Sequence, residues 1–258
     1  MSAKNFKVGL IVPSSNTTME TEIPAILRRR ECEVPDETFT FHSSRTRMQN
    51  VTEDELKKMV RDSDRCAIEL SDARVDVMGY ACLVAVMAQR AGFHTAAEER
   101  LAGLAAHNGG PAPVVSSAGA LVRAAKALGA RKVTLVAPYM KPLTRLVIDY
   151  LQDCGIEVVD SISLEVPNNL EVVRLDPAKL PGLAEKPDRT GAEAVILSAC
   201  VQMPSLPVIQ QAEDRLGLPT ISASVATTYE ILDRLGLDPV VPDVGRLLSG
   251  RLTSAAAR

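Results

Sequence analysis

The fold of this chain is decided by two short stretches, MGYAC at residues 78–82 and ILSAC at residues 196–200. Each is an uncharged, β-prone run that ends in Ala-Cys, and an uncharged segment follows it in both places. Such a run is typical of a buried strand in a parallel sheet. At the carboxyl end of such a strand the chain enters a loop and then a helix, where open α/β sheets place their ligands. The sequence therefore predicts one active site with a cysteine, Cys82 or Cys200, on each side.

Strand-like and helical runs alternate along the whole chain, which favours an α/β fold with parallel sheets. We expect strands at residues 7–13, 37–42, 75–81, 113–116, 132–137, 157–164, 194–199 and 219–222. We expect helices at residues 17–30, 52–73, 94–106, 141–154, 170–173, 176–190 and 206–216. The second group of strands repeats the scheme of the first, which indicates a duplicated unit.

A second pair of matching segments supports the duplication. VVSSAGA at residues 114–120 leads into a helix that ends in LGA, and TISASVA at residues 220–226 leads into one that ends in LGL. We therefore predict two similar halves with the active site in the cleft between them. The expected lobes are residues 1–116 together with 223–258, and residues 117–222.

The composition argues against several classes of function. The 258 residues include 29 basic and 32 acidic side chains, and a formal charge of −3 indicates no basic surface for nucleic acid. The longest uncharged apolar stretch, residues 77–88, is too short to span a membrane. Residues 1–5 lead directly into a strand without a secretory signal pattern, so we expect a cytoplasmic protein. The Ala-rich tail, residues 252–258, is expected to fray.

No familiar cofactor or metal motif occurs in the sequence. The three histidines, His42, His94 and His107, form no zinc-binding spacing, and there is no CxxC. A G-x-G-x-x-G fingerprint after a strand and a Walker-type P-loop are also absent. Five cysteines, an odd number without short spacings, indicate reduced thiols rather than a disulfide framework. We therefore expect an enzyme that needs neither a cofactor nor a metal.

The position of Cys82 and Cys200 at strand ends has two interpretations. A cysteine on an apolar strand is ordinarily a small buried hydrophobe, but two at equivalent strand ends favour an active site. Because backbone amides and the start of the next helix surround a thiol there, we expect them to lower its pKa. The other cysteines have no such surroundings and are assigned to packing or to the surface: Cys32, Cys66 and Cys154.

The first strand ends in the polar segment PSSNTTME at residues 13–20. A Ser or Asn followed three or four residues later by Glu fits a helix cap, and capping accounts for part of the pattern. One cap residue would suffice, however, and free amides and hydroxyls at a helix start also bind anions. Ser14 and Asn16 are therefore candidates for holding a carboxylate, and both interpretations stay open.

Polar residues also follow strands in the second half. Tyr139 comes after the strand that corresponds to the first one, so its hydroxyl would lie at the cleft, but an aromatic ring packed over a helix start explains it as well. Asn169 lies in the turn-like segment VPNNL at residues 166–170, where an Asn is commonly a turn or cap residue. Arg45 and Arg47, after the second strand, would attract a dianion but fit a solvated surface better.

With these residues in place, the chain resembles the maleate cis–trans isomerases of the aspartate/glutamate racemase superfamily. The resemblance rests on GLIVPSSNTTME at residues 9–20, YACLV at residues 80–84 and SACVQMPS at residues 198–205. APY at residues 137–139 and PNN at residues 167–169 occur in the expected order between them. The resemblance covers essentially the whole chain. It implies two flavodoxin-like halves related by a pseudo-twofold axis, no cofactor and a homodimer.

The resemblance also implies roles for individual residues. Cys82 would be the nucleophile and Cys200 its partner acid, while Asn16, Tyr139 and Asn169 would hold the two carboxylates of maleate. Addition of a thiolate to the alkene, rotation of the succinyl-cysteine intermediate and elimination would give fumarate. The expected substrate-binding set is completed by Ser14, Leu83, Val84 and Val201.

Three other functions stay open. An amino-acid racemase of the same superfamily would use two thiols on opposite faces of an α-carbon, but it must recognise an ammonium group. The segments after the cysteines, residues 83–85 and 201–203, are apolar or amide-bearing, which fits a substrate that carries only carboxylates. Arylmalonate decarboxylases keep only one of the two cleft cysteines. A non-catalytic protein that binds a dicarboxylate has no need of paired thiols.

Overall fold

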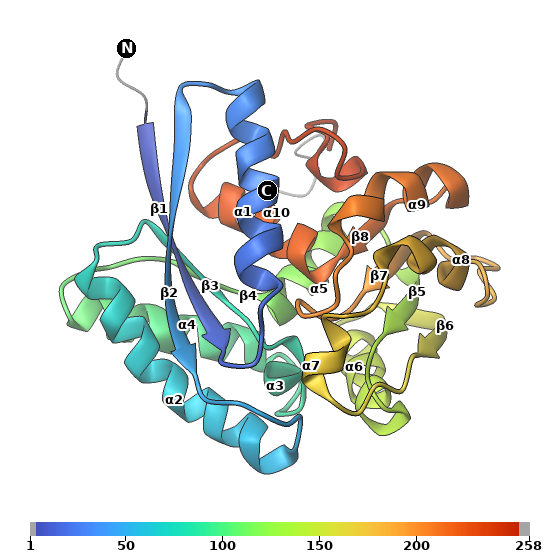
Figure 1. Ribbon diagram of the computed structural model, residues 1–258, viewed down its shortest axis with the longest axis horizontal. Helices are drawn as coiled ribbons and strands as arrows, with labels where there is room; N and C mark the ends of the chain where they lie inside the picture. Colours follow the sequence, from blue (N-terminus) through green and yellow to red (C-terminus); the bar gives the residue numbers. More distant parts are fainter. Residues whose placement is uncertain (1–3, 253–258) are drawn as a thin grey trace.

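Two parallel four-stranded sheets, one from each half of the chain, form the framework of the computed structural model, which describes residues 4–252 (Figure 1). The first sheet has the order β2-β1-β3-β4, from β1 (Lys4–Pro13), β2 (Glu37–Thr46), β3 (Val77–Tyr80) and β4 (Val114–Ser116). The second has the order β6-β5-β7-β8, from β5 (Lys132–Ala137), β6 (Glu157–Ser163), β7 (Ala194–Ser198) and β8 (Thr220–Ser222). The matching order confirms the predicted α/β fold with two similar halves.

Helices connect the strands and cover the sheets. In the first half they are α1 (Met19–Glu33), α2 (Glu53–Asp72), α3 (Leu83–Met87), α4 (Phe93–His107) and α5 (Ser117–Ala127). In the second half they are α6 (Lys141–Asp153), α7 (Asn169–Val172), α8 (Leu180–Ala184), α9 (Ile209–Leu216) and α10 (Ala223–Arg234). The helices α2 and α4 contact the first sheet on one side, and α1 and α10 contact it on the other (Figure 1). Against the second sheet, α6 contacts β6, while α8 and α9 contact β5, β7 and β8.

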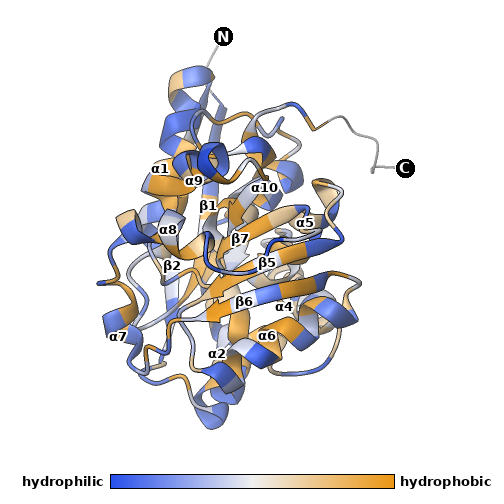
Figure 2. Ribbon diagram, turned by 90° about the vertical axis from the view of Figure 1, so that its right-hand side faces the viewer, coloured by the Kyte–Doolittle hydropathy of each residue, from blue (hydrophilic) through white to orange (hydrophobic). Residues whose placement is uncertain are grey.

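The strands are buried because helices cover them. Every residue of β3, β4, β7 and β8 is buried, and so is β1 from Val8 to Pro13. Figure 2 shows β5 and β7 largely in the colours of hydrophobic residues, whereas the helices alternate between hydrophobic and hydrophilic positions. A parallel strand covered on both faces requires such an uninterrupted apolar run, whereas the edge strands β2 and β6 are only partly buried and carry polar residues.

The two halves match down to the start of the helices that follow β4 and β8. Ser116 caps α5 by accepting a hydrogen bond from the Gly119 N–H at 3.0 Å, and Ser222 caps α10 by accepting one from the Val225 N–H at 3.2 Å. The helices α5 and α10 also pack against each other. The second pair of matching segments in the sequence therefore corresponds to a matched pair of capped helices.

The structure corrects the predicted helix at residues 176–190. In its place are a 3₁₀ turn, Pro177–Lys179, and α8, which ends at Ala184. Pro187 has no backbone N–H and disfavours the helical conformation of the residue before it, which favours the end of the helix before this position. Arg189 instead donates a hydrogen bond to the Ala184 carbonyl at 3.2 Å.

Two elements differ from the prediction where they approach the carboxyl ends of the strands. The helix α3 is missing from the predicted helices, because its five residues are all apolar and present no polar face. The strand β2 continues beyond its expected end at residue 42, because it pairs with β1 along its whole length and places Thr46 opposite Pro13. Residues 47–52, which join β2 to α2, therefore begin beside the end of β1.

Within residues 4–252, no helix is both long and apolar enough to cross a membrane. Residues 253–258 of the tail that we expect to fray, and residues 1–3 of the segment searched for a secretory signal, lie outside the described residues. The expected lobe boundaries, the homodimer and the cytoplasmic location stay predictions.

Candidate active site

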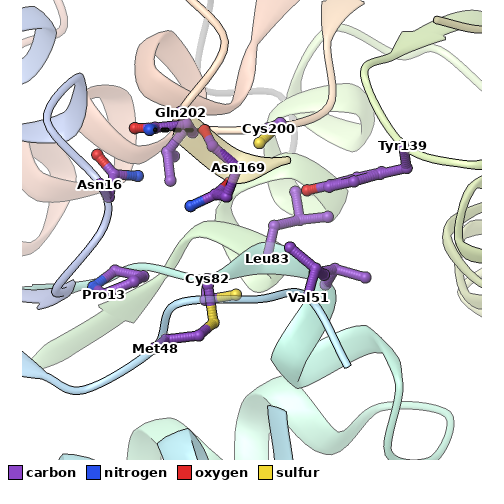
Figure 3. Close-up of a pocket in the computed structure, with 12 residues that line it drawn as sticks. Pro13, Asn16, Met48, Val51, Cys82, Leu83, Tyr139, Asn169, Cys200 and Gln202 are labelled. Atoms are coloured by element: carbon purple, nitrogen blue, oxygen red, sulfur yellow. Dashed lines mark hydrogen bonds between the residues drawn. The ribbon is translucent and has the colours of Figure 1, made fainter. Parts of the chain in front are cut away.

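A cavity lies where the carboxyl ends of strands from both sheets meet (Figure 3). The space between its lining atoms, counted together with the solvent-open part of the cavity, is about 310 Å³. Its polar lining residues follow β1, β3, β5 and β7 or begin α7: Asn16, Cys82, Tyr139, Asn169, Cys200 and Gln202. Its apolar lining residues are Pro13, Met48, Val51, Leu83, Val84 and Val201. Both halves of the chain therefore contribute to one site.

Cys82 and Cys200 face this cavity from opposite sides (Figure 3), and each residue is 7% exposed. Cys82 has a φ of +72°, in the left-handed region where residues other than glycine are uncommon. Such backbone strain is found preferentially at functional sites. Cys200 is held differently, since the Ser198 hydroxyl donates a hydrogen bond to its carbonyl at 2.9 Å. The cysteines assigned to packing or to the surface do not line the cavity: Cys32, Cys66 and Cys154.

Burial raises the pKa of both thiols, which corrects the expectation that the helix start lowers it. For Cys82, burial raises the pKa to about 12, the backbone amides of Ala85 and Val84 oppose the rise, and the charge of Cys200 adds to it. For Cys200, burial also raises the pKa, while hydrogen bonds from the Tyr139 hydroxyl and from two backbone amides oppose the rise. The amides act in the expected direction, but the loss of water around a buried sulfur outweighs them. Moreover, α3 has only five residues, which limits its dipole.

Asn16 caps a helix and presents a donor to the cavity at the same time. Its Oδ1 accepts hydrogen bonds from the backbone N–H groups of Thr18 at 2.9 Å and of Met19 at 3.0 Å. These two bonds fix which end of the amide faces α1. The Nδ2 group consequently points toward the cavity (Figure 3). Asn16 thus satisfies two backbone N–H groups at the start of α1, as the cap interpretation expects, although the N-cap position itself is Thr18, whose side chain makes no capping bond. This arrangement leaves an N–H donor of Asn16 for a ligand.

Tyr139 follows β5 and places its hydroxyl close to Cys200. The hydroxyl donates a hydrogen bond to the Ala199 carbonyl at 3.3 Å. Burial raises the pKa of Tyr139 well above its usual value, and the charges of Cys200 and Cys82 add to the rise. The phenol therefore keeps its proton and remains a hydrogen-bond donor in this cavity.

The adjacent residues Asn168 and Asn169 have different tasks. Asn168 Oδ1 accepts a hydrogen bond from the Leu170 N–H at 2.8 Å and thereby caps α7. Asn169 is 6% exposed and lies on the cavity wall, where its Nδ2 donates to Ser15 Oγ at 2.7 Å. Since an amide nitrogen carries two hydrogens, the second one can serve a ligand. The turn-like PNN segment thus supplies both a cap residue and a cavity residue.

Gln202 is a lining residue that the sequence analysis does not single out. Its Oε1 accepts a hydrogen bond from the Thr17 N–H at 3.0 Å, and its Nε2 donates to the carbonyls of Ser15 at 3.0 Å and Asn169 at 3.1 Å. It is only 2% exposed. A sequence signal for it does exist, since Gln202 is the one polar residue in the otherwise apolar segment 201–203 after Cys200. A polar side chain in a buried segment needs hydrogen-bond partners, which indicates a structural or functional role.

The segment between β2 and α2 closes one side of the cavity through Met48 and Val51. Ser14, which we expect in the substrate-binding set, is exposed and is not among the lining residues. Its hydroxyl accepts a hydrogen bond from the Met48 N–H at 3.0 Å. Ser14 therefore supports the segment that carries Met48. The three apolar residues of the expected set do lie on the wall: Leu83, Val84 and Val201.

The cavity wall carries no formal charge. Among residues 4–252, the side chains that line it include no Asp, Glu, Lys, Arg or His. Arg45 is not a simple solvated cation, because it donates a hydrogen bond to the Asn16 carbonyl and pairs with Glu20 at 3.2 Å. In the same described range, no three His, Cys, Asp or Glu side chains gather as a metal site would need. An anion in this cavity would be held by neutral N–H and O–H donors.

Comparison with known proteins finds relatives over nearly the whole chain. The family model described as arylmalonate decarboxylase matches residues 8–248. The maleate isomerase of Geobacillus stearothermophilus is 62% identical over 249 residues, which make up 96% of this chain and 99% of that protein.

Solved structures of two further relatives have the same fold. A cysteine-to-alanine variant of the maleate isomerase Iso from Pseudomonas putida S16, solved with maleate, is 54% identical with a TM-score of 0.94, and the match covers 96% of this chain and 99% of that one. A cysteine-to-serine mutant of the Nocardia farcinica maleate cis–trans isomerase holds a covalently bound succinylcysteine intermediate. It is 43% identical with a TM-score of 0.91, and the match covers 95% of this chain and 99% of that one.

Proposed function

This chain belongs to the maleate isomerases, within the family that the arylmalonate decarboxylase model describes, and we propose that it converts maleate into fumarate. The observation that carries the proposal is the single cavity that Cys82 and Cys200 face from opposite sides. A thiolate is a soft nucleophile suited to addition to an electron-poor alkene. Maleate and a succinylcysteine in the sites of two relatives support the same chemistry here.

In the proposed reaction, the Cys82 thiolate attacks one alkene carbon of maleate, so that a C–S bond forms and the π bond breaks. The electron pair moves to the second alkene carbon and onto the carboxylate attached to it. Cys200 donates its proton to that carbon and becomes a thiolate. The resulting succinyl-cysteine rotates by half a turn about its central single bond. Cys200 then removes a proton from the same carbon, the C–S bond breaks, and fumarate leaves with both sulfurs in their starting states.

Three neutral donors would hold the carboxylates during these steps. The Nδ2 groups of Asn16 and Asn169 are fixed by hydrogen bonds within the wall. The Tyr139 hydroxyl, whose single hydrogen goes to the Ala199 carbonyl in the free protein, would turn that hydrogen toward a carboxylate. Donors that are already oriented stabilise charge that develops on a carboxylate without having to reorganise. We therefore assign substrate binding to these three side chains, with the apolar wall excluding water around the alkene.

The mechanism requires the two thiols to be in different ionisation states. Burial opposes a charge on either sulfur, and the charge of Cys200 further raises the pKa of Cys82. Two interacting acids of this kind lose their protons in separate steps. We propose that the pair carries one negative charge during turnover, after releasing one proton to solvent. One sulfur can then attack while the other still holds the proton that the intermediate needs.

The uncharged wall favours this proposal over an amino-acid racemase. A racemase must bind an ammonium group, for which carboxylates are the natural partners. Among the described residues, the lining side chains are amides, thiols, a phenol and apolar groups. Such a wall fits a substrate whose only charged groups are carboxylates.

Proton NMR tests the proposal. The protein is mixed with maleate without an added cofactor, and the vinyl signal of fumarate is followed over time. We expect fumarate to form at a rate proportional to the protein concentration. A parallel sample with L-aspartate in deuterated water reports exchange of the α-proton. Exchange on aspartate without any fumarate from maleate would contradict the proposal and identify a racemase.

A further inference from the structure

Gln202 uses the whole hydrogen-bonding capacity of its side-chain nitrogen within the protein. Both Nε2 hydrogens have acceptors, the carbonyls of Ser15 and Asn169, and Oε1 accepts from the Thr17 N–H. A glutamine amide has only two N–H groups, so neither is left for a carboxylate. Although Gln202 lines the cavity, its side-chain amide therefore hydrogen-bonds only to backbone groups of neighbouring segments.

Two of these bonds are made to the residues directly before and after Asn16 in the sequence. Ser15 and Thr17 are the two neighbours of Asn16, and Gln202 holds a backbone group of each. In addition, the Thr18 hydroxyl donates to the Gln202 carbonyl at 2.8 Å. The segment that carries Asn16, from the first half of the chain, is thus fixed against the segment after β7, from the second half.

Asn169 is held by the same arrangement (Figure 3). Its carbonyl accepts from Gln202 at 3.1 Å, and its side chain donates to Ser15 Oγ at 2.7 Å. Gln202, Ser15 and Asn169 therefore form a closed set of hydrogen bonds that restricts both the backbone and the side chain of Asn169. Cys200 lies two residues before Gln202, so the loop of this thiol is tied to the same set.

We propose that Gln202 is a positioning residue that sets the placement of the Asn16 and Asn169 amides relative to the Cys200 thiol. This inference rests on the proposed function, in which those amides hold the carboxylates of maleate. Gln202 acts through the two asparagines and does not itself bind the substrate. A displacement of about 1 Å in such a group can cost on the order of a hundredfold in rate. The bonds of Gln202 therefore matter to catalysis although none of them reaches the substrate.

Glu22 provides a matched comparison. It lies on α1 and reaches across in the opposite direction, where it accepts hydrogen bonds from the N–H groups of Ser205 at 2.6 Å and Leu206 at 2.7 Å. Like Gln202, it is buried, but it links α1 itself, rather than the segment before α1, to the segment after β7. Its hydrogen bonds, however, do not involve either asparagine of the cavity. A Glu22 variant therefore tests whether the loss of any hydrogen-bonded link between the two halves changes KM, or only the loss of a link to the cavity asparagines.

The first experiment compares KM and kcat for maleate. Gln202→Met nearly keeps the side-chain volume and removes the three side-chain hydrogen bonds, so we expect kcat/KM to fall about tenfold to a hundredfold, with a rise in KM that partial unfolding alone would not produce. Glu22→Met removes the Oε1 that accepts both backbone N–H groups, so it should lower the melting temperature without changing KM, because partial unfolding lowers only the apparent kcat. Gln211→Met, at an exposed position of α9, should change neither quantity. A wild-type KM in Gln202→Met would overturn the proposal.

A double-mutant cycle then separates positioning from direct binding. If Gln202 acts through Asn169, Gln202→Met raises KM less in an Asn169→Ala background than in the wild-type protein, because effects of coupled residues are not additive. If Gln202 held the substrate itself, the two effects would multiply in full. Full multiplication would overturn the positioning role.

Hydrogen exchange of the substrate-free protein keeps this inference separate from the proposed function. Gln202→Met removes the acceptor of the Thr17 N–H, so exchange at Thr17 should accelerate, while exchange at Val225, which Ser222 caps, should not change. Faster exchange at Thr17 in a protein that does not convert maleate would reject the proposed function but retain the link. Unchanged exchange at Thr17 would overturn the link itself.

Discussion

The thiols of Cys82 and Cys200 lie on opposite sides of one cavity, and the charge of Cys200 raises the pKa of Cys82. Each cysteine follows the corresponding strand of its own sheet, β3 or β7. Their surroundings nevertheless differ, since Cys82 has a positive φ and Cys200 has the Tyr139 hydroxyl nearby. The duplication thus places two thiols at equivalent strand ends, and their different surroundings make the two thiols chemically different. The proposed chemistry needs this inequality, because one sulfur attacks while the other transfers a proton.

The raised pKa of Cys82 predicts a pH dependence for its alkylation in the free protein. A thiol is neutral when protonated, so burial favours the protonated form and leaves little thiolate near neutral pH. With a pKa of about 12, the rate of modification by iodoacetamide should rise about tenfold per pH unit between about pH 6 and pH 9. Peptide mass spectrometry measures the rate at Cys82. A plateau below about pH 8 would instead indicate a preformed thiolate.

Replacement of the nucleophile should remove activity and preserve the fold. In Cys82→Ala, we expect the rate of fumarate formation to fall on the order of 10³-fold or more, because the sulfur that forms the C–S bond of the proposed intermediate is gone and Cys200 is left without its partner. Cys154→Ala serves as the control, since Cys154 is only half-buried and does not line the cavity. Proton NMR measures the rate, and circular dichroism verifies folding. Turnover by folded Cys82→Ala close to that of the wild type would refute the assignment.

The two functions of Asn16 can be separated by two substitutions. Asn16→Asp keeps an oxygen that accepts from Thr18 and Met19, but it replaces the donor that faces the cavity with a negative charge. We expect its stability to stay close to that of the wild type while KM for maleate rises strongly. Asn16→Ala loses the cap as well and should be destabilised by about 1 kcal/mol. Urea unfolding and steady-state kinetics measure the two effects, and an unchanged KM in Asn16→Asp would exclude Asn16 from carboxylate binding.

The adjacent asparagines of α7 give a matched pair of variants. Asn169→Ala removes an amide that lies on the cavity wall, so KM for maleate should rise. Asn168→Ala removes only an exposed cap and should lower stability by about 0.5–2 kcal/mol without changing KM. Steady-state kinetics on both variants checks the contrast. Equal effects of the two substitutions on KM would indicate that both act by disturbing α7, and that Asn169 does not bind the substrate.

Much of the fold could be predicted from the sequence because its signals are local. The apolar runs that become β3 and β7 need no distant information, and neither do the Ser116 and Ser222 caps. The repetition of these signals was enough to predict two similar halves and a shared site. The short α3 escaped prediction because an apolar helix of five residues has no periodicity to detect.

The remaining features of the site depend on contacts between distant parts of the chain. The bond between Thr17 and Gln202 joins residues 185 positions apart, and no local pattern encodes it. The same limit applies to the thiols, since the local amides indicated a lowered pKa and the tertiary burial of Cys82 reversed it. The position of Ser14 outside the cavity lining could not be predicted for a similar reason, because its partner Met48 lies on a segment whose position β2 determines.

The most direct test of the shared-cavity mechanism is peptide mass spectrometry of Cys200→Ser after incubation with maleate. In Cys200→Ser, water can still protonate the adduct, but no thiolate is left to remove a proton from the succinyl-cysteine. Its breakdown should therefore slow by on the order of 10²–10⁴-fold, and the intermediate should accumulate. The account predicts a thioether with the added mass of one maleic acid on Cys82, and no such addition in Cys82→Ala. An unmodified Cys82 in a Cys200→Ser protein that still forms fumarate, or an addition confined to the exposed Cys32, would contradict it.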